Sequence, residues 1–255
     1  MRFAELTAPE IRDFSREGTL VVAPVAAVEQ HSRHLPVSTD TILATAVAEG
    51  LEQALADRVV LLPTLWLGPS EHHLGFGGTL TATLPTYEQI LVDLLTPPLR
   101  DGFRRVLILN GHGGNNDPLR VALRRLDRDF PRAILTGSAY WDLASREVAA
   151  LCQGPRKEMG HACEIETSMM LHLRPDLVRA NLIADDPDDT PHELLGLTWA
   201  RDFARRTHHG AVGHPERADA ETGRRMLAAI VARVAAVASA VLNLPLPDLA
   251  GGSGN

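Results

Sequence analysis

Hydrophobic and polar residues alternate along the chain in stretches of two kinds. Short runs rich in β-branched residues and leucine predict buried strands at residues 19–25, 58–65, 105–110 and 132–138. Longer stretches with apolar side chains at helical spacing predict helices at residues 40–56, 86–101, 116–129, 163–174 and 219–242, the second broken at Pro97 and Pro98. We therefore expect an α/β fold, with three α/β/α layers around a mainly parallel central sheet.

The rest of the chain is less regular. The segment 181–218 is rich in Asp, Pro, His and Gly, which favours loops with one helix near 192–206. A length of 255 residues suits one α/β domain. We expect a single domain over residues 1–248, followed by a flexible tail at 249–255 that includes the final "GGSGN".

Composition excludes several classes of partner. The formal charge of −7 gives no general attraction to nucleic acid or anionic lipid. The two cysteines, Cys152 and Cys163, supply neither a disulfide framework nor a thiolate metal site, and they favour a reducing cytoplasm. No apolar signal-peptide region is visible in the first residues. The apolar stretch from Met226 carries Arg233 in its middle, so we interpret it as a packed helix at a subunit interface, not a membrane span.

Three polar clusters each follow a predicted strand. They are "EQHSRHLPVSTD" after the first strand, "GPSEHH" after the second and "NGHGGNND" after the third. Ligands of open parallel sheets bind outside the carboxyl ends of the strands, where such loops converge. The three clusters therefore predict a common site.

The first cluster has the spacing of a chelate. In an extended segment, alternate side chains share a face, so Glu29 and His31 can point to one place. Asp40 stands where a helix should begin, and a carboxylate there can cap the helix or bridge two cations. The alternative is an ordinary polar loop with Asp40 as the N-cap.

The third cluster places His112 between glycines. These let the backbone turn sharply and bring the imidazole over the end of the strand. A glycine-rich loop that opens a helix can instead bind phosphate. The cluster departs from the dinucleotide-binding pattern, however, because Asn116 stands where that pattern has its last glycine.

A fourth cluster, "MGHACEIETSMMLHL", places His161 at the start of a predicted helix. Glu166 is followed three and four residues later by Met169 and Met170, so in a helix its carboxylate would lie against an apolar surface. A carboxylate there needs a cation or hydrogen-bond donors to stay charged. A metal ion would supply this. An ion pair with an arginine is the alternative.

Taken together, these residues form a set of nitrogen and oxygen ligands, which suits Zn²⁺, Mn²⁺ or Fe²⁺. The set is Glu29, His31, Asp40, His112 and Glu166. It is large enough for two metals that share one bridging carboxylate, and such a pair activates water for hydrolysis of an amide-like bond. His161 could pass a proton to the leaving nitrogen. Two other functional classes stay open. One is a phosphate- or nucleotide-binding module, and the other is a structural or assembly protein in which a metal ion only holds loops together.

The four clusters resemble motifs of the creatininase (creatinine amidohydrolase) family, and the resemblance covers the chain from about residue 5 to 240. "EQHSRHLPVSTD" resembles the family's E-Q-H-G-x-H-L-P-x-x-x-D, "SEHHLGFGGT" its S-x-E-H-x-x-F-x-G-T, "NGHGGN" its histidine loop and "HACEIETS" its H-A-G-x-x-E-T-S. The resemblance implies two divalent metal ions per subunit and frequently a hexamer. It implies that Glu29, His31, Asp40 and His112 bind metal, with Asp40 as the bridge, and that His161 lies beside the substrate. It further implies substrate contacts for Trp141 and for Glu71 and His72 of the second motif.

Departures from creatininase itself bear on the substrate. Creatininase has a metal-binding glutamate where this chain has Gly114, and we expect Glu166 to complete the second metal site. Creatininase holds its substrate between two tryptophans, of which Trp141 matches one and Lys157 replaces the other. These differences disfavour creatinine. The family also includes formamide hydrolases of cofactor pathways and a peptidase, so the expected substrate is a small amide, cyclic amide or formamide.

Overall fold

The computed structural model describes residues 1–248 except 187, 189, 191–193, 195, 196 and 198, so the predicted tail at 249–255 lies outside the described residues. Four parallel strands form one sheet in the order β2-β1-β3-β4. The strands are β1 (Leu20–Val25), β2 (Val59–Leu61), β3 (Arg105–Asn110) and β4 (Ile134–Ala139). The predicted parallel sheet is therefore confirmed.

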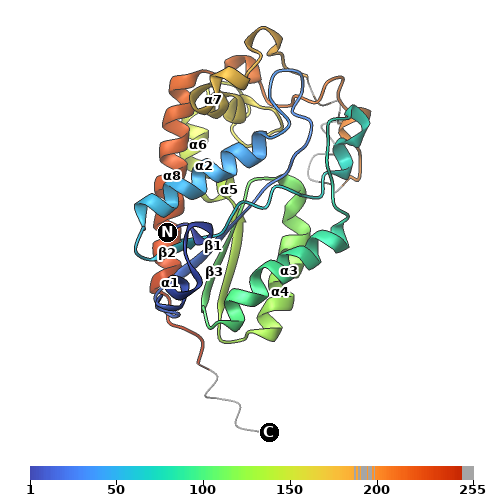
Figure 1. Ribbon diagram of the computed structural model, residues 1–255. Coiled ribbons are helices and arrows are strands. Elements are labelled where there is room, and N and C mark those ends of the chain that lie inside the picture. The colour runs from blue at the N-terminus through green and yellow to red at the C-terminus, as the bar shows by residue number, and fades with distance from the viewer. Residues whose placement is uncertain (187, 189, 191–193, 195–196, 198, 249–255) are drawn as a thin grey trace.

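Helices cover both faces of this sheet. One face carries α2 (Thr39–Ala54) and α8 (Ala220–Asn243), with α7 (Glu164–Leu173) packed against them, and the other carries α3 (Leu84–Arg100) and α4 (Asn116–Asp129) (Figure 1). Three further helices are short: α1 (Ala8–Arg12), α5 (Tyr140–Leu143) and α6 (Ser145–Leu151). This is the expected three-layer α/β/α arrangement.

The alternation of side chains along β1 explains the two layers. Leu20 and Val22 are buried in the core formed with α2, α7 and α8, whereas Val21 and Ala23 are buried in the core formed with α3 and α4. Because both faces of the sheet are covered, all six residues of β1 are buried. This accounts for its uninterrupted apolar sequence.

Three elements differ from their predictions. β2 ends at Leu61 instead of residue 65, because Pro63 has no N–H to continue the ladder. α3 runs unbroken through Pro97 and Pro98 to Arg100. Each proline lacks an N–H and so removes one backbone hydrogen bond, but both lie in the last turn, so the helix ends soon after them. The helix predicted near 192–206 lies partly outside the described residues, and the described part contains the short 3₁₀ helix Phe203–Arg205.

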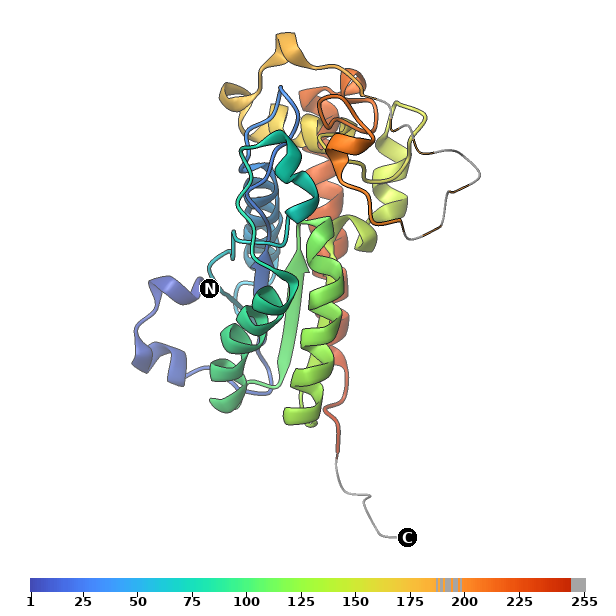
Figure 2. The same cartoon turned by 90° about the vertical axis from the view of Figure 1, so that its right-hand side faces the viewer.

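The long helix α8 runs beside the sheet for most of the molecule's length (Figure 2). By length and composition alone it could cross a membrane. Met226, Ile230 and Val234, however, are buried and pack in the core shared with α2 and α7. This matches the interpretation of α8 as a packed helix.

Gly223 lets α8 lie close against α7, the helix that carries Glu166. A Cβ atom at Gly223 would lie 1.8 Å from the carbonyl oxygen of Ser168. Helix propensity alone favours alanine by about 1 kcal/mol, but we expect Gly223→Ala to destabilise the fold by about 1–3 kcal/mol through overpacking. Chemical denaturation measures the change. A stabilised variant would contradict the close packing.

Candidate metal centre

The loops that follow β1 and β3 meet at the carboxyl end of the sheet. The backbone N–H of Glu29 donates to the carbonyl of Val37 (2.9 Å), which closes the first loop. In the second loop the side chain of Asn110 accepts from the N–H of His112 (3.0 Å) and donates to its carbonyl (2.7 Å). These bonds fix the two loops where the sequence predicts a common site.

Asp40 lies between the two histidines that these loops supply. Its Oδ1 is 3.0 Å from Nε2 of His31, and its Oδ2 is 3.1 Å from Nδ1 of His112. α2 begins at Thr39 with Ser38 as its N-cap, so Asp40 is not the capping residue. The carboxylate is buried and turned toward the imidazoles, and the capping alternative is therefore wrong.

The nitrogens that face Asp40 are the ones left free for a metal. Nδ1 of His31 lies 3.1 Å from the carbonyl oxygen of Glu29, and Nε2 of His112 lies 3.1 Å from that of Pro69. A carbonyl only accepts, so these nitrogens carry the ring hydrogens of the neutral histidines. In the neutral form that binds a cation, the opposite nitrogens are unprotonated and face the carboxylates.

The two glutamates of α7 have different roles. Oε1 of Glu166 lies 3.5 Å from Nε2 of His31, and Oε2 accepts from the N–H of Cys163 (3.1 Å). These contacts take the place of the arginine pair considered for Glu166. Glu164 points elsewhere, because it accepts from the backbone N–H groups of Gln153 (2.5 Å) and Gly154 (2.8 Å). Glu164 is therefore a structural carboxylate.

The donor set fits divalent cations. Among the described residues, the buried Oε2 of Glu29 has no hydrogen-bond partner, and the buried Oδ2 of Asp40 and Nε2 of His31 face only other groups of the candidate ligand set. Buried polar atoms are normally satisfied, and their convergence here is typical of a metal site. His31, Asp40 and Glu166 also offer ligand atoms that all lie within 4.8 Å of one another.

The electrostatics of the centre follow from this crowding. Burial raises the pKa of Glu29, an effect that His112 opposes. Burial would also raise the pKa of Asp40, but the charges and hydrogen bonds of His31 and His112 lower it below its ordinary value. Burial and the charge of His31 hold the pKa of His161 well below the ordinary value, so this imidazole is neutral near pH 7.

A cavity of about 240 Å³ opens onto the centre. Its lining includes the carboxylates of Glu29, Asp40 and Glu166 together with Trp141 and His161. Trp141 thus lies where the resemblance places a substrate contact. Glu71 is exposed, and His72 is half-buried and stacks on His112 with ring centroids 5.8 Å apart; among the described residues neither lines this cavity.

His73 is the main residue that the sequence interpretation missed. It is buried, and its Nε2 lies 3.3 Å from Oε1 of Glu29. The motif S-x-E-H-x-x-F places its histidine three residues before the phenylalanine. Counting back from Phe76 therefore selects His73 instead of His72, and this spacing was the available signal.

Two departures from creatininase have a structural counterpart. A Cβ atom at Gly114 would lie 2.2 Å from the carbonyl oxygen of Pro69, so this backbone has no room for a side chain there. The ammonium group of Lys157 donates to the carbonyl of Cys152 (2.6 Å). Lys157 therefore does not replace the second tryptophan as a stacking surface.

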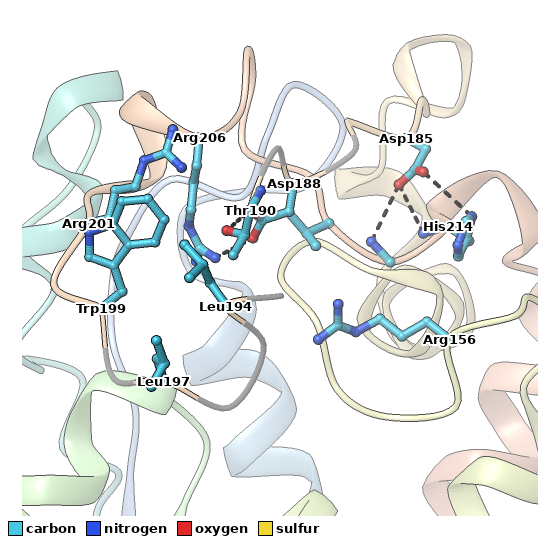
Figure 3. Close-up of a pocket in the computed structure, with 12 residues that line it drawn as sticks. Arg156, Asp185, Asp188, Thr190, Leu194, Leu197, Trp199, Arg201, Arg206 and His214 are labelled. Atoms are coloured by element: carbon cyan, nitrogen blue, oxygen red, sulfur yellow. Dashed lines mark hydrogen bonds and ion pairs between the residues drawn. The ribbon is translucent and has the colours of Figure 1, made fainter. Parts of the chain in front are cut away.

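A larger cavity of about 560 Å³ lies beside the centre (Figure 3). Val212 lines it and pairs through the backbone with His161 (N–O distances 3.0 and 2.7 Å), so the two cavities share this wall. Within the larger cavity, Asp188 pairs with Arg206 and Asp185 pairs with His214. These charges are already compensated, whereas the buried centre has unpartnered ligand atoms.

Known proteins with similar sequences are hydrolases. A family model described as creatinine amidohydrolase matches residues 4–238. The mycofactocin precursor peptide peptidase of Mycolicibacterium smegmatis is 32% identical over 219 residues, which cover 83% of this chain and 81% of that protein. The creatinine amidohydrolase of Pseudomonas putida is 28% identical over 235 residues, which cover 85% of this chain and 87% of that protein.

Solved structures agree with this result. A crystal structure of creatinine amidohydrolase superposes with a TM-score of 0.80 at 26% identity and covers 96% of this chain and 98% of that one. A creatininase described as the Mn form (TM-score 0.79, 25% identity, 95% and 99% covered) and a mutant described as the Zn-Zn type (0.80, 26%, 95% and 98%) are also similar. The chain therefore belongs to the creatininase (creatinine amidohydrolase) family of hydrolases.

Proposed function

We propose that this chain hydrolyses the C–N bond of a small amide, cyclic amide or formamide with two divalent cations. Glu29, Asp40 and His112 would hold one cation, and His31, Asp40 and Glu166 the other. Solved creatininases described as Mn and Zn-Zn forms support manganese or zinc for this chain. A cytoplasmic homo-oligomer, with a hexamer as the expected form, completes the proposal.

One observation carries this proposal. The two oxygens of the buried Asp40 face two different histidines at 3.0 and 3.1 Å. A carboxylate placed between two metal-ligating groups is the bridging arrangement that a two-metal site needs. The buried carboxylate of Glu29, whose Oε2 has no hydrogen-bond partner among the described residues, adds to the negative charge that would attract cations.

Two residues that line the cavity, Trp141 and His161, have defined tasks in the proposed reaction. The cations, when bound, would lower the pKa of water and polarise the carbonyl oxygen of the substrate. Trp141 forms an apolar wall of the cavity against which a flat amide can lie. His161 is neutral and lines the same cavity, so it can accept a proton and deliver it to the leaving nitrogen.

Reconstitution tests the proposal. Protein stripped with a chelator and reloaded with Zn²⁺ or Mn²⁺ is assayed against formamides, cyclic amides and short peptides. We expect hydrolysis of an amide that is lost on stripping and restored on reloading. Metal-independent hydrolysis would contradict the proposal, as would a wild-type protein that binds no metal.

A peptide is a second candidate substrate. The 32% identity to a mycofactocin precursor peptide peptidase favours it, and creatinine is disfavoured because Lys157 does not supply a second stacking face. The short peptides in the assay distinguish the two substrate classes. Hydrolysis of peptides but not of formamides or cyclic amides would assign this chain to the peptidase class.

Cation binding should release protons. Burial lowers the pKa of His112, but the charge of Glu29 and the hydrogen bond that His112 donates to Asp40 outweigh this and raise it to about 10. The pKa of His31 is also raised, through Asp40 and against the effect of burial. Both histidines are therefore protonated at pH 7 in the metal-free protein, and their ligand nitrogens must lose a proton when a cation binds.

We expect about two protons released per subunit at pH 7, and an apparent metal affinity that falls as the pH is lowered. Isothermal titration calorimetry in two buffers of different ionisation enthalpy measures this release. Equal heats in the two buffers would show that these histidines do not exchange a proton for the metal.

A further inference from the structure

The geometry points to His73 as a positioning residue: oriented by Gln30, it donates a hydrogen bond to Glu29 and holds that carboxylate in the direction a metal requires. This inference rests on the proposed function, because it concerns a ligand of the proposed metal centre. It adds two residues to the centre: His73, which contacts Glu29, and Gln30, which contacts His73.

The orientation of the Gln30 side chain is fixed by a backbone donor. The N–H of Ser32 donates to Oε1 of Gln30 (2.9 Å), and a backbone N–H can only donate. Ser32 reaches this position with a φ of 58°, in the left-handed region. Oε1 is therefore the acceptor end of the amide, and Nε2 is the donor end.

This orientation settles which nitrogen of His73 carries the hydrogen. Nε2 of Gln30 lies 2.8 Å from Nδ1 of His73 and donates to it. A neutral imidazole that accepts at Nδ1 carries its hydrogen on Nε2.

The hydrogen on Nε2 then faces the metal ligand. Nε2 of His73 lies 3.3 Å from Oε1 of Glu29, the carboxylate whose second oxygen has no partner. Oε1 also lies 3.3 Å from Nδ1 of His112, so a donor held on it fixes the carboxylate beside the proposed ligand nitrogen. Hydrogen bonds of this kind orient metal ligands in many proteins, and their loss typically lowers metal affinity by about 10- to 100-fold.

Packing holds His73 and Gln30 in place. The ring of Phe203 stacks on His73, with centroids 4.3 Å apart and an interplanar angle of 26°. A Cβ atom at Gly210 would lie 2.6 Å from Oε1 of Gln30, and Gly210 has a φ of +86°. Both contacts come from the segment 181–218, which thereby supports the proposed metal centre.

Metal affinity tests the positioning role without an activity assay. Metal-free wild-type protein, His73→Phe and His73→Gln each compete with a chromogenic chelator for Zn²⁺. His73→Phe keeps an aromatic ring against Phe203 but has no donor, whereas His73→Gln keeps an N–H near the position of Nε2. His172→Phe, on an exposed position of α7, is the matched control.

We expect about 10- to 100-fold weaker binding of one Zn²⁺ equivalent by His73→Phe, wild-type binding by His172→Phe, and recovery of most of the affinity in His73→Gln. Two equivalents bound by His73→Phe with wild-type affinity would overturn the role of His73 alone. No binding by the wild-type protein would instead overturn the proposed metal centre.

A second measurement does not depend on a variant that folds. ¹⁵N NMR of the metal-free wild-type protein, with multiple-bond correlations, reports which nitrogen of each histidine carries the hydrogen. The inference requires that His73 carry it on Nε2. A hydrogen on Nδ1 would contradict both the orientation of Gln30 and the bond to Glu29.

Discussion

Replacement of Asp40 by asparagine is expected to remove bound metal and to lower kcat/KM by about 10³-fold or more, since metal ions supply several kcal/mol of transition-state stabilisation. Asparagine keeps the shape of the side chain but offers one neutral oxygen in place of two charged ones. Asp40 faces His31 and His112 with different oxygens, so both metal sites should be affected. Elemental analysis and the amide assay measure the two effects.

The same substitution at an exposed position gives the control. Asp117 lies in the first turn of α4, just after the His112 loop, and its side chain is 88% exposed. Asp117→Asn should keep wild-type metal content and activity. If Asp40→Asn retained two metal equivalents per subunit, Asp40 would not be the bridge.

Replacement of His161 by asparagine is expected to separate chemistry from metal binding. His161 lines the cavity, and its Nε2 lies 2.8 Å from the carbonyl oxygen of Gln30, which fixes the direction of the ring. Loss of a general acid or base typically costs about 10²- to 10⁴-fold in rate. We therefore expect kcat to fall by this factor while both metal equivalents stay bound.

Two measurements check the result. Steady-state kinetics gives kcat, and elemental analysis of the same sample gives the metal content. His172→Asn, on an exposed position of α7, should change neither. A His161→Asn enzyme with wild-type kcat would exclude proton transfer by His161, and one that had lost metal would make His161 a ligand.

Local signals in the sequence were sufficient for the elements that carry the ligands. β3 ends at Asn110 and α4 spans Asn116–Asp129, as predicted, because an apolar run and an amphipathic stretch meet at a glycine-rich loop. Glu29 and His31 offer ligand atoms within 4.8 Å of each other, in line with the shared face of alternate side chains, and Asp40 reaches His31 from the first turn of α2. In each case the information is contained in a few neighbouring residues.

The parts that were missed depend on contacts between distant segments. His72 and His73 are adjacent in a 3₁₀ helix (Glu71–Phe76), and apart from the spacing to Phe76, what distinguishes His73 is its contact with Glu29, 44 positions away in the chain. Phe203 stacks on His73 from a segment without periodicity, so no local pattern indicates it. The helix period of α3 likewise did not show that Pro97 and Pro98 fall in its last turn.

The most direct test of the central claim is a crystal of this protein loaded with Zn²⁺ and measured at the zinc absorption edge. The two-metal account predicts two anomalous peaks in each subunit, each about 2.0–2.2 Å from a different oxygen of Asp40. One peak should lie beside Glu29 and His112, and the other beside His31 and Glu166. A single peak, or two peaks that do not share Asp40, would contradict the account.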